Sequence, residues 1–223
     1  SDEEMKEWLT SNKPNWGSKW QAGDVKYKDL TGEGEVTPGA STLENHGDLK
    51  RIGNNSPRYR VGLNLDAAWK GIDFSIFFQG VLKRDWMFDA GDPYFWGAGS
   101  GMWQAACFEE HMDYWTPENT DAYYPKPYFN ETKNQQAQDA YMQKASYLRC
   151  KNIQLGYTLP THITEKAGIS NCRIYLSCDN LFTITGLSSV YDPEAFGSYD
   201  GYGTSGKTYP LQRTISVGVN LNF

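Results

Sequence analysis

The sequence predicts an all-β fold: an antiparallel transmembrane β-barrel, of which this chain supplies the carboxyl-terminal strands, with long extracellular loops. Residues 214–223 (TISVGVNLNF) alternate apolar and polar side chains and close on an aromatic residue. Because side chains alternate between the two faces of a strand, this segment has one apolar and one polar face. The same alternation recurs in four earlier segments, and the connections between them are alternately short and long, as in outer-membrane barrels.

Residues 58–70 and 71–83 are the first two predicted strands. Their apolar positions are Tyr59, Val61, Leu63, Leu65, Ala67 and Trp69 in the first, and Ile72, Phe74, Ile76, Phe78 and Leu82 in the second. Lys70 and Gly71 between them form a two-residue hairpin signal. The two segments therefore predict an antiparallel pair with matched faces.

Residues 147–158, 173–184 and 213–223 are the remaining predicted strands. Ile153 and Leu155 fall on the apolar face of the third, and Leu176 on that of the fourth. Strict alternation puts Cys150 on a polar face and Cys178 on an apolar face. Segments of 11 to 13 residues exceed the usual globular strand of about 5–6 residues and suit a tilted membrane span of about 9–11 residues.

The connections alternate in length along the chain. Two residues join the first pair and residues 159–172 join the third and fourth strands, whereas residues 84–146 and 185–212 are long. Short turns face the periplasm and long loops face outside in such barrels. We therefore expect 84–146 and 185–212 to be outer loops and 1–57 to be an extracellular region before the first strand.

Composition fits this architecture. The 223 residues contain no run of about 18 apolar residues, so a transmembrane helix is excluded. The mean hydropathy of −0.65 remains compatible with a barrel, in which only alternate residues face lipid. The net charge of −6 gives no reason to expect nucleic-acid binding. Five strands cannot close a membrane barrel of at least eight, so we expect a larger protein in which Ser1 is an internal position.

Eight short motifs occur along most of the chain. They are residues 23–34 (GDVKYKDLTGEG), 52–59 (IGNNSPRY), 71–80 (GIDFSIFFQG), 113–119 (DYWTPEN), 147–160 (YLRCKNIQLGYTLP), 179–183 (DNLFT), 191–194 (YDPE) and 209–214 (YPLQRT). Together and in this order, they resemble the carboxyl-terminal region of SusC/RagA-type TonB-linked outer-membrane transporters. The resemblance implies a 22-stranded barrel with an amino-terminal plug, a SusD-like surface lipoprotein as lid, and energy from the TonB complex. It also implies active import of glycans, or else of oligopeptides.

The long loop 84–146 is rich in aromatic side chains, which stack on the apolar faces of sugars. The candidates for contact with a ligand or with the lid are Trp86, Tyr94, Phe95, Trp96, Trp103, Trp115, Tyr123 and Tyr124. The alternative is that these rings pack the loop against itself, as large ordered loops require.

Residues 29–40 resemble an acidic calcium loop. Asp29, Thr31, Glu33 and Glu35 occupy positions 1, 3, 5 and 7, but position 12 is Ala40 where an EF-hand has a bidentate glutamate. The missing ligand favours a plain polar loop. The sequence therefore predicts no cofactor, with calcium as the only metal to consider.

The last strand also predicts an assembly signal. Ser216, Gly218, Leu221 and Phe223 have the polar, glycine and two apolar positions of the segment that the outer-membrane assembly machinery reads. An unpaired edge strand can pair with the edge of another protein. Ordinary closure of the barrel would use the same residues, and both roles are compatible.

No catalytic arrangement is predicted. The carboxylate pairs Glu109/Glu110 and Asp192/Glu194 could suggest glycosidase chemistry, but they lie in predicted loops, and the three histidines are scattered. We therefore expect a non-enzyme in the outer membrane, in contact with its lipid. The alternative function is a secreted carbohydrate-binding β-sandwich, which would have shorter strands and no alternation of loop lengths.

Overall fold

The computed structural model describes residues 1–99, 107–195 and 209–223, which form two compact units. The first, here called the loop unit, comprises residues 1–53, 87–99 and 107–142. The second, the strand unit, comprises residues 54–86, 143–195 and 209–223. Each unit has its own packing and is described by itself. Trp103, one of the predicted aromatic candidates, lies outside the described residues.

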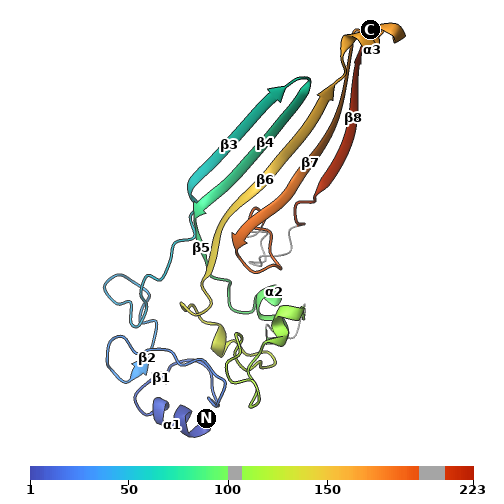
Figure 1. Ribbon diagram of the computed structural model, residues 1–223. Coiled ribbons are helices and arrows are strands. Elements are labelled where there is room, and N and C mark those ends of the chain that lie inside the picture. Colours follow the sequence, from blue (N-terminus) through green and yellow to red (C-terminus); the bar gives the residue numbers. More distant parts are fainter. Residues whose placement is uncertain (100–106, 196–208) are drawn as a thin grey trace. The chain divides into compact units, whose positions relative to one another are not determined.

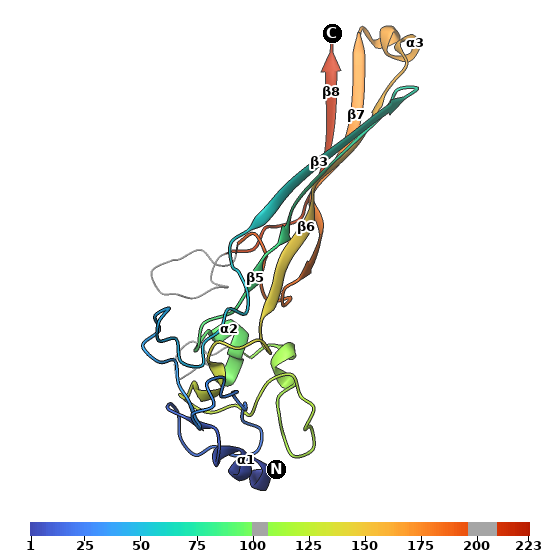
Figure 2. The same cartoon turned by 90° about the vertical axis from the view of Figure 1, so that its left-hand side faces the viewer.

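The strand unit is one antiparallel sheet of long strands (Figure 1). In spatial order the strands are β3 (Arg58–Trp69), β4 (Ile72–Lys83), β6 (Gln143–Thr158), β7 (Asn171–Gly186) and β8 (Thr214–Asn222). A short strand, β5 (Asp85–Trp86), extends the pairing along the start of β6. Figure 2 shows the same strands from the side. The predicted all-β, antiparallel character is confirmed, and β6 begins four residues before the predicted strand.

The β3–β4 hairpin turns where the sequence predicts it. Trp69 pairs with Ile72, so Lys70 and Gly71 alone make the turn, with φ of +49° and +85°. Two positive φ values are the mark of a type I′ turn, whose twist matches that of the flanking strands. The Lys70 ammonium lies 4.7 Å from the centroid of the Trp69 ring, which gives this non-glycine residue a local contact.

Registers across the sheet separate the apolar and polar positions into two faces. One row joins Leu65, Ile76, Ile153, Cys178 and Ile215, all on the same face. The adjacent row on the other face joins Asp66, Ser75, Gln154, Ser177 and Ser216. The apolar row is not a core, because Leu65 is 50% exposed and Ile215 is 67% exposed. The sheet thus presents one apolar and one polar face.

A β-bulge interrupts the alternation in β6. Phe77 pairs with Asn152 whereas Phe78 pairs with Cys150, so Lys151 is an extra residue. The prediction that Cys150 lies on the polar face was wrong, because a bulge reverses the faces of the residues before it. The buried Cys150 instead pairs with Phe78 and Phe182 on the apolar face. The same reversal places Arg149 on the polar face.

Short helices and turns complete the two units. In the loop unit, α1 (Asp2–Leu9) starts at a capping box made by Ser1 and Glu4, and β1 (Lys13–Pro14) pairs in parallel with β2 (Glu35–Val36). The remaining elements are α2 (Pro93–Trp96), η1 (Gly97–Gly99), η2 (Glu109–Met112) and η3 (Lys133–Gln135) in the loop unit, and α3 (Thr161–Thr164) and η4 (Glu165–Ala167) between β6 and β7. None of the helices in the described ranges is long and apolar enough to cross a membrane.

Candidate functional site

Several of the predicted aromatic candidates form the interior of the loop unit. Phe95 is 1% exposed and Trp96 5% exposed, and their ring centroids are 4.8 Å apart in an edge-to-face contact. Tyr124 and Tyr141 pack against both rings. Edge-to-face contacts of this kind add to the stabilisation that area burial provides. Burial therefore gives Phe95, Trp96 and Tyr124 a packing role.

The other predicted aromatics differ in position. Tyr123 is exposed, Tyr94 and Trp115 are half-buried, and Trp86 belongs to the strand unit. Trp115 packs on Gly23, whose positive φ and lack of a Cβ admit the indole. Within the loop unit, Trp96 is buried and so forms no exposed surface with Tyr94, Trp115 and Tyr123. Their predicted contact with a ligand or lid stays a prediction.

Local hydrogen bonds set the aromatic cluster in place. The Asp92 carboxylate caps α2 by accepting from the amides of Tyr94 (3.0 Å) and Phe95 (2.9 Å). His111 is buried, and its Nδ1 accepts from the Phe108 amide while its Nε2 lies 2.9 Å from the Tyr94 carbonyl oxygen. Both ring nitrogens are thus engaged in structural contacts. His111 therefore connects the turn at Phe108 with α2 at Tyr94.

A cavity of about 320 Å³ lies beside this cluster. Its walls include four aromatic residues, Trp96, Tyr114, Tyr124 and Tyr128, together with polar residues such as Lys126 and Asn134. Burial raises the pKa of Tyr124 and of Tyr128, so both phenols stay neutral and act only as hydrogen-bonding groups at physiological pH.

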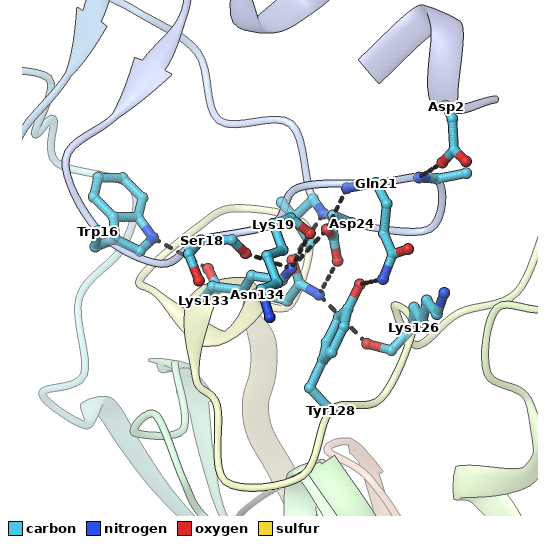
Figure 3. Close-up of polar contacts among 12 residues, drawn as sticks. Asp2, Trp16, Ser18, Lys19, Gln21, Asp24, Lys126, Tyr128, Lys133 and Asn134 are labelled. Atoms are coloured by element: carbon cyan, nitrogen blue, oxygen red, sulfur yellow. Dashed lines mark hydrogen bonds and ion pairs between the residues drawn. The ribbon is translucent and has the colours of Figure 1, made fainter. Parts of the chain in front are cut away.

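A buried ion pair joins two distant segments of the loop unit (Figure 3). The Lys133 ammonium lies 2.9 Å from the Asp24 carboxylate, and both side chains are fully buried. Lys133 Nζ also donates to the carbonyl oxygens of Ser18 (3.1 Å) and Lys19 (3.2 Å). Its three donors are therefore all used, as a buried ammonium requires.

The neighbours of this pair complete its hydrogen bonding. Asp24 accepts from the Gln21 amide (2.8 Å) and from the Asn134 side chain (2.9 Å). The Lys133 carbonyl accepts from the Trp16 indole (3.1 Å) and the Tyr27 hydroxyl (2.9 Å). This polar hub, centred on Asp24 and Lys133, was not predicted. Lys133 and Asn134 carry no local pattern, and only the fold brings them to Asp24.

The acidic loop after Asp29 is held by amide donors. The Asp29 carboxylate accepts from the amides of Gly32 and Gly34, and these bonds hold its pKa below the usual range. The Asp48 carboxylate accepts from the amides of Leu30 (2.6 Å) and Thr37 (2.7 Å). The carboxylates of Asp29 and Asp48 thus both accept backbone amides of residues 30–37. Among the described residues no group of three or more His, Cys, Asp or Glu side chains is arranged to hold a metal ion, and Glu33 and Glu35 are exposed.

The polar face of the strand unit contains an ion pair across three strands. Arg173 of β7 reaches over β6 to Asp73 of β4, and its guanidinium also donates to Gln154 (2.9 Å). Gly156 lies beneath this pair, where any Cβ would collide with both charged groups. The glycine inside a strand is therefore explained by the charge pair that crosses it.

A second charged cluster binds the segment after β7 to β6. Arg149 donates to Asp192 (2.8 Å), and Lys151 donates to Glu194 (3.1 Å). Burial opposes ionisation of Asp192, but bonds from the Glu194 amide and from Arg149 outweigh it and hold the pKa of Asp192 below its usual value. The carboxylates of Asp192 and Glu194 are therefore paired with Arg149 and Lys151 of β6. The β6 bulge places Arg149 on the face where it meets Asp192.

The residues predicted to form the assembly signal lie on both faces of β8. Gly218 is on the polar face opposite Tyr175, whose ring covers the space that a Cβ would fill. Leu221 and Phe223 are exposed, as is Ser216. The Tyr175 ring thus also explains why residue 218 is a glycine, and the assembly signal itself stays a prediction.

Comparison with known proteins places this fold in a class. No protein-family model matches the chain. It is 30% identical over 208 residues to TonB-dependent receptor P3 of Formosa agariphila, covering 90% of this chain and 19% of that protein. It is 26% identical over 208 residues to TonB-dependent receptor P26 of the same organism, covering 90% and 20%. The chain spans about a fifth of the length of these relatives.

Solved structures add a likeness in fold. The RagAB peptide importer in its open-open state aligns with a TM-score of 0.55 and 29% identity, over 76% of this chain and 17% of that one. The closed-closed state aligns with a TM-score of 0.57 and 26% identity, over 75% and 17%. The chain therefore belongs to the TonB-dependent receptor class. Within that class it is of the SusC/RagA type, and the resemblance predicted from the eight motifs is confirmed.

Proposed function

We propose that the chain is a segment of a TonB-dependent outer-membrane importer, in which the strand unit forms part of the barrel wall. The observation that carries the proposal is the two-faced sheet. Its apolar side is exposed along every long strand, including Leu63 (52%), Leu155 (51%), Leu176 (49%) and Val217 (75%). A contiguous apolar surface of this kind requires a partner, and lipid satisfies it while the polar face lines a hydrated interior.

The rival secreted β-sandwich fits these observations less well. A sandwich buries the apolar faces of two packed sheets against each other. The described residues contain one large sheet, whose apolar face is exposed, and the pair β1–β2 has only two residues in each strand. Strands of up to 16 residues also exceed the usual globular length. The barrel wall is therefore the better account of the sheet.

The proposed cargo is an oligomeric nutrient, with glycans first and oligopeptides second. Active import would proceed by capture beneath a SusD-like lipoprotein lid and by TonB-driven release through parts outside this chain. The lipoprotein partner rests on the resemblance carried by the eight motifs, whereas the likeness to the RagAB peptide importer bears on the cargo. That likeness favours oligopeptides as the second candidate. The chain itself would contribute wall and loops and no chemistry.

The test is loss of uptake in the producing bacterium. Deleting the gene that encodes this chain should abolish uptake of a fluorescent oligosaccharide or oligopeptide too large for porins, while uptake of free glucose and alanine stays normal. Removing TonB should give the same loss. Normal uptake of all oligomeric substrates in the deletion strain would contradict the proposed function.

The assembly signal has its own test within this proposal. Deleting Phe223 should lower the amount of folded protein in the outer membrane, because the assembly machinery would lose an aromatic contact. Deleting the exposed loop residue Leu43 serves as a control of equal size. Equal amounts of folded protein after both deletions would contradict the assembly signal and leave β8 only the role of closing the barrel.

A further inference from the structure

A second and larger space lies in the loop unit, away from the aromatic cluster. It is a cleft of about 490 Å³ between residues 25–52 and residues 136–140, with Trp16 in its wall. Val36 and Ile52 supply apolar surface, and Gln136 and Asp139 supply polar groups. A cleft of this size falls in the range of small-ligand sites. No role predicted from the sequence accounts for it.

The charges around the cleft are unevenly distributed. Lys26, Lys28 and Lys50 line it; Lys26 forms an ion pair with Glu4, whereas Lys28 and Lys50 are exposed and form no salt bridge within the part of the chain that the structure describes. Two carboxylates, Asp48 and Asp139, also line the cleft.

The two carboxylates differ in availability. Both Asp48 oxygens already accept backbone amides, those of Leu30, Thr31 and Thr37, and in the described part of the chain Asp48 forms no salt bridge with Lys28 or Lys50. Asp139 is exposed and remains open to a ligand hydroxyl. Among the described residues, the cleft therefore offers two cations, Lys28 and Lys50, that form no ion pair, beside one exposed carboxylate, Asp139.

We propose that this cleft binds an anionic saccharide unit, one that carries a carboxylate or a sulfate. The half-buried Trp16 provides an aromatic surface for the apolar face of a sugar ring. Gln136 and Asp139 accept hydrogen bonds from hydroxyl groups, and Lys28 and Lys50 pair with the anionic substituent. The inference rests on the proposed function and narrows its substrate class from glycans in general to acidic glycans.

The two lysines favour an anionic saccharide over a neutral one in this cleft. A neutral sugar would use Trp16 and the polar groups but would leave Lys28 and Lys50 without a role. Interactions of exposed cations with an anion weaken as salt screens them. Binding to the cleft is therefore expected to fall as ionic strength rises, which separates it from stacking alone.

The experiment uses the complete transporter that contains this chain, purified in detergent, with calorimetric titration. The probes are a tetrasaccharide of galacturonate, a sulfated galactan tetrasaccharide, a neutral galactan tetrasaccharide and a tetraglutamate peptide. The test variant is Lys28→Ala/Lys50→Ala. Lys166→Ala, at an exposed lysine in η4 outside the cleft, is the matched control.

At least one acidic saccharide should bind the wild type, and the double variant should bind it about a hundredfold more weakly, roughly tenfold for each lost charged hydrogen bond. Lys166→Ala should bind like the wild type. The carboxylate and sulfate probes identify which anion is preferred. Unchanged binding by the double variant, equal binding of the neutral probe, or binding of tetraglutamate in place of the saccharides would overturn the inference.

Uptake assays separate failure of this inference from failure of the proposed function. If cells import the acidic saccharide only when the gene is present, yet the double variant imports and binds normally, the function stands and the cleft is not the site. If the deletion strain imports every probe normally, the proposed function itself fails.

Discussion

Replacing Ile76 with arginine is expected to destabilise the membrane-inserted protein by about 2–4 kcal/mol, the cost of a cation on the lipid face near the bilayer midplane. Ile76 lies in the apolar row, between Leu65 and Ile153. Ser75→Arg is the matched control, because Ser75 is the adjacent residue on the polar face, opposite Asp66. The control should be nearly neutral.

The measurement is urea unfolding of the complete transporter in lipid vesicles, with the folded fraction followed by gel mobility of unheated samples. Ile76→Arg should unfold at a clearly lower urea concentration than Ser75→Arg. Equal losses for the two variants would contradict a wall with one lipid face, since they add the same side chain to the same strand.

Replacing Lys133 with methionine is expected to disrupt the loop unit at a cost of about 3–5 kcal/mol, because it leaves the Asp24 carboxylate buried without its cation. Asp24 and Lys133 are both fully buried, so solvent cannot compensate for the loss. Methionine keeps most of the side-chain volume, which limits the contribution of lost packing.

Two further variants isolate the charge effect. Lys133→Met/Asp24→Asn removes both charges and should recover part of the loss, while Lys13→Met, at an exposed lysine of β1, should have little effect. The readout is protease cleavage of the loop unit in intact cells. Resistance of Lys133→Met equal to that of the wild type would show that the ion pair does not hold the unit together.

The strands were predictable because lipid and water impose a period of two on the side chains. Leu65, Ile76 and Ile153 mark one face by sequence alone, and the positive φ values of Lys70 and Gly71 follow from a two-residue hairpin. The bulge at Lys151 was not predictable. It inserts one residue into β6 and is visible only in the register with β4, where it accompanies the contacts of Arg149 and Lys151 with Asp192 and Glu194.

The candidate sites were less predictable, for a physical reason. An aromatic residue in a long loop can either pack or remain exposed, and the sequence pattern is the same; the fold decides that Phe95 and Trp96 are buried. The Asp24–Lys133 pair depends on two segments that are far apart in sequence. The lysines of the proposed saccharide cleft likewise come from separate loop segments, and no spacing rule connects Lys28 with Lys50.

The most direct test of the barrel-wall account is a nitroxide scan along β4, residues 73–79, in the complete transporter in lipid vesicles. Each residue is replaced in turn by a spin-labelled cysteine in a background without native cysteines. Collisions with oxygen report lipid, and collisions with a water-soluble nickel chelate report water. The account predicts high oxygen access at residues 74, 76 and 78 and high nickel access at 73, 75, 77 and 79. Equal access of both reagents at adjacent residues, without a period of two, would contradict it.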